Sequence, residues 1–451
     1  MSAAAERTRS EGLIVFLVGA IQFINILDFV IPLPMGPDLA RGLGFNSDQI
    51  GYVGGAYTYA AAVSGLAGSF FLDRFDRRKV VAVSMTGLVL GTLAGAFAQG
   101  LPSLMASRIL AGIFGGPATS VSMSIVADVV PVERRGAALS RVAAAFSVAQ
   151  VLGTPLALEL SLRLGWRAPF LVTAGAGVLV VGAAVAALPP IRGHLEKGGG
   201  PVTHHQVLKE AREILGLPVV QLSYLTTAVV MAGGFILIPN ISAYVQDNIG
   251  YPREHLQWLY FGGGIASFLA MMVVGRLVDR HGPFRIGLVG AIALSITVYL
   301  GFVNYPALAR ALAPVSAIKV SLHAGFASIS IINLAGFPVL ALYVAFMTSV
   351  AFRNVSYNTL ASRVPQPRWR ARFMSFQSTV QHLAAALAAS AGAWILGKAA
   401  PGQPLQHIEV VAWLTILLTI CLPVLLRAVE SRVKAREQTQ IDAKRSALAP
   451  S

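Results

Sequence analysis

The stretch SFFLDRFDRRK, residues 69–79, decides the fold of this chain of 451 residues. It places two aspartates among four basic residues, between two long apolar runs. The stretch GRLVDRHGPFR, residues 275–285, repeats it, and Asp279 follows Asp73 at a distance of nearly half the chain. A repeat at fixed spacing marks a repeated structural unit, so these two copies predict two homologous halves.

The rest of the composition indicates a membrane protein. Charged residues make up 12% of the chain and hydrophobic residues 55%, whereas soluble domains average about 25% charged residues. Continuous apolar runs of about 20 residues, the length that crosses a bilayer as a helix, recur throughout. We therefore expect an all-α integral membrane protein with twelve transmembrane helices in two pseudo-symmetric six-helix bundles. The expected spans are 13–34, 49–71, 80–99, 103–127, 138–160, 168–189, 218–240, 256–278, 285–303, 337–360, 373–396 and 410–429.

The distribution of basic residues predicts the orientation. Most of the 35 lysines and arginines lie in the tails, in the turns after spans 2, 4, 8 and 10, and in the loop after span 6. The side richer in these residues is cytoplasmic, so both termini are expected there, in a multi-pass protein of the inner (plasma) membrane. The same clustering excludes a nucleic-acid partner despite the net charge of +15. The opposite loops hold only Arg41, Arg163, Arg167, Arg253, Arg310, Lys319 and Lys398.

The boundaries of the halves follow from the loops. We expect an N-terminal bundle over residues 1–190, a linker over 191–217, a C-terminal bundle over 218–430 and a cytoplasmic tail over 431–451. Within the linker, Gln206–Leu215 has one apolar helical face and predicts a short helix on the membrane surface.

A second internal echo locates an insertion. The stretch VPVERRGAALS, residues 130–140, resembles VPQPRWRARFMS, residues 364–375, and these two copies lie farther apart than the two charged turns. The excess falls at about 304–336. A thirteenth span there would move the following arginines to the wrong side, so we expect an insertion on the outer face.

Several chemistries find no support in the sequence. The chain has one cysteine, Cys421, which excludes an intrachain disulfide. His204 and His205 are adjacent but have no further ligands nearby, so no metal is expected. Neither a phosphate-binding Gly-rich loop nor a nucleophile elbow is present. We expect no cofactor and no enzyme activity.

Ionisable residues inside apolar spans indicate a transport path, because they are costly there unless they face a cavity or a partner. Asp28 lies in span 1, with Gln22 and Asn25 before it at helical spacing. Asp28 and Arg108, in span 4, both lie roughly 8–9 Å below the outer ends of their helices, at about 1.5 Å per residue. Asp28 is therefore either a proton carrier that Arg108 modulates or one half of a permanent buried ion pair.

The second half has a cationic patch in span 10. Arg353, Asn354, Tyr357 and Asn358 share helical spacing, and such a patch suits an anionic or hydroxyl-rich group of a substrate. The alternative is that Arg353 bonds structurally to carbonyls at a helix end. Other candidate residues of a substrate cavity are Gln22, Asn25, Gln150, Asn240, Gln377 and Gln381.

Together, the two six-helix halves and the charged turns after spans 2 and 8 resemble the major facilitator superfamily. The family turn is Gly-x-x-x-Asp-Arg-x-Gly-Arg-Arg/Lys; Gly275, Asp279 and Gly282 match it, whereas Ser69 and Asp76 replace glycines in the first copy. Arg108 followed by Gly112, Gly115 and Gly116, and LGTP at residues 152–155, resemble motifs of the bacterial twelve-helix drug:proton antiporter branch, which includes sugar-efflux-like members.

The resemblance implies a conformational gate at the turn after span 2. In this superfamily that turn lies beside the start of span 11, so Asp73 is expected to cap span 11 in the outward-open state, with Arg74 or Arg77 paired to Asp128. Anchoring of basic residues on the cytoplasmic side is the alternative. The second copy, with Gly275, Asp279, Arg280 and Gly282, is expected to be scaffold.

These observations predict a monomeric transporter whose partners are a small-molecule substrate, protons and the lipid bilayer. It would export a small apolar or amphipathic solute by proton antiport and alternating access. The alternatives are a sugar, metabolite or lysolipid carrier of the same fold, or a membrane sensor that no longer transports.

Overall fold

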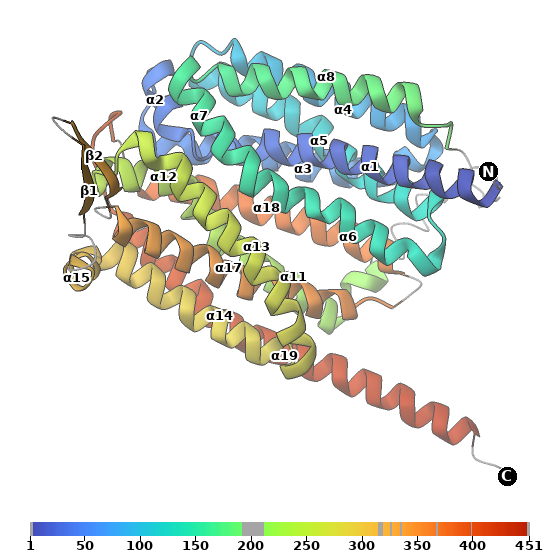
Figure 1. Cartoon of the computed structure of the whole chain (residues 1–451). Coiled ribbons are helices and arrows are strands. Elements are labelled where there is room, and N and C mark those ends of the chain that lie inside the picture. The colour runs from blue at the N-terminus through green and yellow to red at the C-terminus, as the bar shows by residue number, and fades with distance from the viewer. Residues whose placement is uncertain are drawn as a thin grey trace.

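The computed structural model describes residues 3–191, 212–313, 319–324, 327–333, 336–366, 369–397 and 399–448. Its first half is built from long helices joined by short turns (Figure 1). In chain order these are α1 (Ala3–Val30), α2 (Gly36–Leu43), η1 (Ser47–Gln49), α3 (Ile50–Phe71), η2 (Leu72–Arg74), α4 (Arg77–Ala96), α5 (Leu101–Val129), α6 (Val132–Val148), the π-turn η3 (Ala149–Gly153), α7 (Thr154–Leu164) and α8 (Ala168–Ala187).

The second half repeats this plan. Its elements are α11 (Pro218–Phe235), η4 (Ile238–Asn240), α12 (Ile241–Ala243), η5 (Tyr244–Asn248), η6 (Arg253–His255), α13 (Leu256–His281), α14 (Pro283–Val298), η7 (Tyr299–Val303), α15 (Tyr305–Ala311), α17 (Phe337–Arg363), α18 (Arg370–Ile395) and α19 (Ile408–Leu448). Helix α19 continues without interruption into the expected tail, and both termini lie at one end of the bundle, which we call the termini end (Figure 1).

The internal repeat extends well beyond the two charged turns. The spacing that separates Asp73 from Asp279 also separates the start of α3 from the start of α13, and the start of α4 from the start of α14. The same spacing relates η1 to η6 and relates Gly44 to Gly250, whose φ angles are 69° and 77°. Left-handed backbone of this kind favours glycine, so both halves make the same turn with the same residue type.

The expected insertion departs from the all-α fold. Strands β1 (Lys319–Ala324) and β2 (Ala327–Asn333) pair antiparallel and project at the end opposite the termini, here called the hairpin end (Figure 1). The physical reason is visible in KVSLHA and ASISIIN, where apolar and polar residues alternate with the two-residue period of a strand. The expectation of an insertion at that end missed this change of secondary structure.

Ten segments of the described chain are long and apolar enough to cross a membrane. The other two expected spans, 49–71 and 373–396, correspond to α3 and α18, which have 22 and 26 residues. Because an α-helix rises about 1.5 Å per residue, these two helices also have the length of a bilayer core. The count of twelve and the cytoplasmic position of the termini stay predictions.

The apolar cores show how the halves meet. One core at the hairpin end contains buried residues of both halves, among them Leu39 and Leu158 from the first and Leu256 and Val411 from the second. Toward the termini end, one core contains only first-half residues, and separate cores contain only second-half residues. The described halves therefore share an apolar core only at the hairpin end.

The expected linker lies mostly outside the described residues, including His204, His205 and most of Gln206–Leu215. Residues 212–215 are helical, with Ile214 buried in a second-half core and Leu215 42% exposed.

Candidate functional site

Asp28 and Arg108 form an ion pair inside the first half. Asp28 lies in the last turn of α1, which ends just before the two prolines, Pro32 and Pro34, of the following turn. Arg108 lies two turns into α5. Its Nη1 is 2.9 Å from Asp28 Oδ1, and the side chains are 1% and 0% exposed. Their similar depths, predicted from the sequence, correspond to a direct contact.

Neighbouring helices complete the surroundings of this pair. Thr92 of α4 donates its hydroxyl to Asp28 Oδ1 at 2.7 Å, and Arg108 Nη2 donates to the Gly91 carbonyl at 3.3 Å. The Arg108 guanidinium lies 5.3 Å from the centroid of the Phe170 ring of α8. Asp28 Oδ2 is buried and has no hydrogen-bond partner among the described residues. The carboxyl group is thus held through one of its two oxygens.

A neutral polar cluster lies one turn earlier on α1. Asn25 donates to the Gly115 carbonyl at 2.9 Å and to the Thr119 hydroxyl at 2.7 Å, while the Tyr57 hydroxyl donates to Asn25 Oδ1 at 2.7 Å. A Cβ at Gly115 would collide with the Tyr57 hydroxyl. The cluster ties α1 to α3 and α5 directly beside the ion pair.

Arg353 of α17 is buried in the second half, where its guanidinium lies next to the last turn of α11. Its side chain lies beside Gly233 and Gly234, and a Cβ built on Gly234 would be 3.2 Å from Arg353 Nη2. Gly234 stands at the position that the internal repeat makes equivalent to Asp28, so in the second half a glycine replaces the acid. Within the described chain no carboxylate forms an ion pair with Arg353, and the last turn of α11 presents the negative end of a helix dipole to it.

The remaining predicted cavity residues do not form one hydrogen-bonded set. Gln381 donates to the Tyr357 hydroxyl at 2.8 Å, and Gln150 Oε1 accepts from Thr154 at 3.5 Å. Asn358 is exposed. The other side chains each leave at least one buried polar atom without a partner among the described residues: Gln22, Asn240, Asn354 and Gln377.

An open groove of about 710 Å³ lies elsewhere, on the surface between α3, α5 and α18, and its lining residue Val63 is 70% exposed. Its lining is almost entirely apolar and includes Tyr52, Tyr59, Val63, Ile113 and, from the second half, Ser390. Its volume is in the usual range of small-molecule sites. None of the residues predicted for the substrate cavity lines it.

In the first charged turn, Asp76 has a role that the sequence did not reveal. Its Oδ1 accepts from the backbone N–H of Arg78 at 3.0 Å and from that of Ile191 at 3.2 Å, so it caps α4 and holds the end of the first half. Arg77 Nε lies 3.3 Å from Asp128 Oδ2. Arg74 is exposed, and the side chain of Asp73 is outside the described part of the chain.

The second charged turn builds the same cap with a different residue. Gly282 has a φ of 85° between α13 and α14, and the backbone N–H of Phe284 donates to Glu430 Oε2 at 3.2 Å. Glu430 belongs to α19 and therefore replaces the local aspartate of the first copy. Asp279 and Arg280 are exposed, and nothing lies within 4 Å of a Cβ built on Gly275.

Sequence reasoning missed Thr92, Tyr57, Glu430 and the pair of Asp38 with Arg253 at the hairpin end. Thr92 and Tyr57 are single polar residues in apolar helices, which give no pattern by themselves. The pairings of Glu430 and Asp38 join positions 146 and 215 residues apart, and such contacts depend on tertiary packing.

Comparison with known proteins agrees with this architecture. The family model described as Major Facilitator Superfamily matches residues 18–389 and 223–450. The chain is 28% identical over 282 residues to a chloramphenicol efflux pump of Mycobacterium tuberculosis, covering 61% of this chain and 66% of that protein. It is 30% identical over 249 residues to the inner membrane transport protein YdhP of Escherichia coli, covering 55% and 62%. The match thus spans slightly less than two thirds of either relative.

Solved structures of low sequence identity share the fold. A D-xylose–proton symporter superposes with a TM-score of 0.68 at 14% identity, covering 92% of this chain and 96% of that one. A bacterial homologue of the human lysosomal transporter Spinster superposes with a TM-score of 0.63 at 16% identity, covering 96% and 98%.

Proposed function

Because the chain belongs to the major facilitator superfamily, we propose that it exports a small apolar or amphipathic solute in exchange for protons, by alternating access. The relatives are named for transport, one as a chloramphenicol efflux pump and the other as an inner membrane transport protein. The solute class, the coupling ion and the mechanism are the proposal. The expected setting is the bacterial inner membrane, with the protein acting as a monomer.

The observation that carries the proposal is the unequal packing of the two halves. They share an apolar core at the hairpin end and have separate cores at the termini end. If the termini are cytoplasmic, as the basic residues predict, this conformation is closed to the outside and its halves are separate toward the cytoplasm. Rocking of the halves about the centre of the membrane would reverse this arrangement.

Proton coupling is assigned to Asp28. In the described chain its buried carboxylate is paired with Arg108, and Oδ2 is unpartnered. A rearrangement of α1 relative to α5 would weaken that contact and favour protonation, because burial disfavours an unpaired charge. A permanent ion pair is the alternative, and the close contact in this conformation is compatible with both.

The M. tuberculosis relative and the apolar groove favour an apolar or amphipathic solute. The name of that relative specifies chloramphenicol efflux, and the open groove of 710 Å³ has an almost wholly apolar lining that includes two tyrosines. Arg353 would then stabilise the end of α11 structurally. A sugar, metabolite or lysolipid carrier remains the second candidate, because Arg353 and the unpartnered Asn354 offer polar groups to such a solute.

The gate at the termini end is assigned to the first charged turn. Arg77 and Asp128 are in contact in this conformation, and we assign to Asp73 the capping of α18 when the termini end closes. Asp73→Asn should slow alternation and leave membrane insertion intact. Unchanged transport would show that the turn serves only as a cytoplasmic anchor.

The decisive test is solute uptake by inside-out membrane vesicles with and without an imposed proton gradient. We expect uptake of chloramphenicol or other small amphipathic compounds only when the vesicle interior is acidic, with uptake lost when an ionophore collapses the gradient. Gradient-independent uptake would reject proton antiport. Binding of a compound without any flux would favour the sensor.

A further inference from the structure

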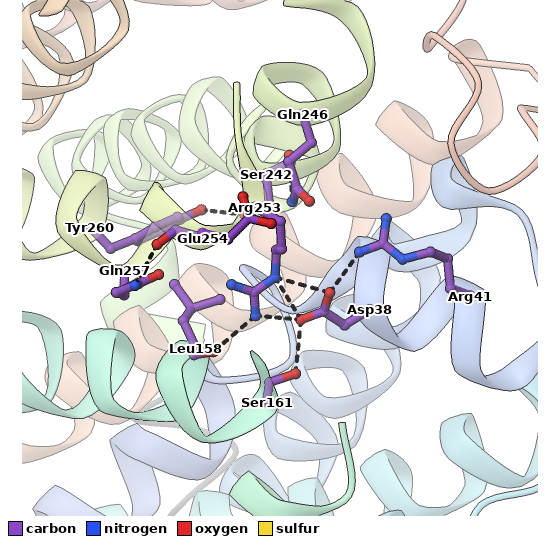
Figure 2. A network of polar contacts seen from close by, with 10 residues as sticks. All are labelled: Asp38, Arg41, Leu158, Ser161, Ser242, Gln246, Arg253, Glu254, Gln257 and Tyr260. Atoms are coloured by element: carbon purple, nitrogen blue, oxygen red, sulfur yellow. Dashed lines mark hydrogen bonds and ion pairs between the residues drawn. The ribbon is translucent and has the colours of Figure 1, made fainter. Parts of the chain in front are cut away.

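An ion pair joins the two halves at the hairpin end. Asp38 lies on α2 of the first half, and Arg253 begins η6 of the second. Arg253 Nη2 is 2.6 Å from Asp38 Oδ2, and its Nε lies 3.0 and 3.1 Å from the two carboxylate oxygens. Figure 2 shows the guanidinium facing the carboxylate side-on. A bidentate pair of this kind adds directional hydrogen bonds to the charge attraction.

First-half groups extend this contact. The Ser161 hydroxyl of α7 donates to Asp38 Oδ2 at 2.8 Å, and the Leu158 carbonyl accepts from Arg253 Nη2 at 2.9 Å (Figure 2). The Asp38 and Arg253 side chains are only 14% and 13% exposed. Arg253 is therefore inserted between α2 and α7 of the opposite half, where solvent screens the pair less than at an open surface.

A second contact also joins the two halves, and here a first-half turn reaches the second half. Ser47 and Asp48 belong to η1 of the first half and reach the turn between α18 and α19 of the second. The Ser47 N–H donates to the Ala399 carbonyl at 3.0 Å, and the Ala399 N–H donates to Asp48 Oδ1 at 3.0 Å. Ser47 and Asp48 are 1% and 4% exposed.

These two contacts are related by the internal repeat. The turns η1 and η6 occupy equivalent positions in it and precede the equivalent helices α3 and α13. Each docks on the other half, η6 on α2 and α7 and η1 on the turn that follows α18. We call this pair of contacts the clasp. One arm is ionic, and the other consists of hydrogen bonds to a buried backbone segment.

We propose that the clasp holds the hairpin end closed and that Asp38 and Arg253 are positioning residues that set the ratio of the closed to the open conformation at this end. The proposal rests on alternating access as the proposed function. Both arms join residues of different halves, so the hairpin end cannot open without breaking them. When the two contacts break, the side chains of Arg253 and Asp48 become exposed to water and are hydrated again.

The clasp is also connected covalently to the Asp28 site. Asp38 and Asp28 are ten residues apart, on α2 and the end of α1, joined by the turn that contains Pro32 and Pro34. Release of Asp38 frees α2 and allows the end of α1 to shift relative to Arg108. The ionic arm thus connects opening at this end to the surroundings of the carboxylate assigned to proton coupling.

Distance measurements on the full-length protein in lipid nanodiscs test the clasp directly. Spin labels replace Leu164 on α7 and Trp258 on α13, which are 69% and 64% exposed, after Cys421→Ser removes the exposed native cysteine. We expect one short distance in the parent protein. Asp38→Ala and Arg253→Gln should each add a longer distance, and Asp38→Ala should raise the open-to-closed ratio about tenfold or more, because it leaves a buried cation without its acidic partner. Arg253→Gln should have the smaller effect, because Asp38 keeps its 2.7 Å contact with Arg41 of its own helix.

Matched variants separate the clasp from general disturbance. Arg163→Gln removes an arginine from the same end whose partner, Glu159, is in its own half, and it should leave the distances unchanged. Asp48→Asn tests the second arm, with a smaller shift expected. The exchange Asp38→Arg with Arg253→Asp should recover part of the closed population.

Two outcomes would overturn the proposal. In the first, Asp38→Ala and Arg253→Gln both show the same distance distribution as the parent protein. In the second, Arg163→Gln opens the hairpin end as much as these two variants do. The measurement needs no substrate or proton gradient. A shift in distances without any solute flux would therefore support the clasp and reject the proposed function. Solute flux in the parent protein, together with variants whose distances do not shift, would support the proposed function and reject the clasp.

Discussion

Arg108 Nη1 lies 2.9 Å from Asp28 Oδ1, and neither side chain is more than 1% exposed. Removing one partner of such a pair strands the other charge in an apolar interior, which costs about 3–5 kcal/mol. A variant of either residue therefore alters folding as well as transport. Two kinds of substitution therefore separate the roles of this site: one that replaces the carboxyl group of Asp28, and one that keeps it but removes a hydrogen bond to it.

The first prediction separates these effects. Asp28→Asn should abolish proton-gradient-driven uptake in inside-out vesicles, because an amide side chain does not take up and release a proton in the physiological pH range. Thr92→Val removes the 2.7 Å hydrogen bond to Asp28 Oδ1 but keeps the carboxyl group, so gradient-driven uptake should persist. Thermal unfolding in detergent provides the structural control. A permanent ion pair is indicated if Asp28→Asn lowers the melting temperature and still supports full gradient-driven uptake.

Gly115 provides a second prediction, based on close packing. A Cβ there would collide with the Tyr57 hydroxyl and lie 3.0 Å from Asn25 Oδ1, so Gly115→Ala should destabilise the protein by about 1–3 kcal/mol, as overpacking does. Tyr57→Phe removes the colliding hydroxyl. The double variant should therefore unfold at a higher temperature than Gly115→Ala alone.

Gly136→Ala is the matched control, since a Cβ there would have nothing within 4 Å. Equal destabilisation by Gly115→Ala and Gly136→Ala would contradict the packing argument, and so would a double variant no more stable than Gly115→Ala.

The parts of this structure that sequence could predict are those set by periodicity and local composition. Apolar runs located the spans, and the charged turns located the repeat. Equal depth in two helices made the Asp28–Arg108 contact possible, but that spans 1 and 4 adjoin was implied only by the resemblance to the family. The contact of Asp38 with Arg253 could not follow, because Arg253 looked like an ordinary loop cation and its partner depends on how the halves close. Glu430 likewise caps α14 only because α19 passes beside it.

The two helix caps form the third prediction. Asp76→Ala and Glu430→Ala each remove a carboxylate from a helix N-terminus, at α4 and α14 respectively. Loss of a cap costs about 0.5–2 kcal/mol. Asp76→Ala should be the more damaging, because Asp76 also accepts from the Ile191 N–H.

The melting temperature in detergent, with Asp279→Ala as the control, measures this difference. Asp279 is exposed in the equivalent turn, so its loss should be nearly neutral. A larger effect of Asp279→Ala than of Glu430→Ala would show that the second turn relies on its own aspartate.

The last prediction concerns acid at the hairpin end. Burial raises the pKa of Asp38, but the hydrogen bond and charge of Arg253, the Ser161 hydroxyl and the charge of Arg41 lower it, and the net pKa is below its ordinary value of 3.8. Arg41 also faces Asp247 of η5. A carboxyl with a lowered pKa contributes stability above its ordinary pKa and loses it only as the pH falls through the lowered value. The ionic arm should therefore stay intact between pH 7.5 and 5. The Leu164–Trp258 label distance should not change over this interval, whereas opening within it would mean that Asp38 is protonated far above the pKa its partners impose.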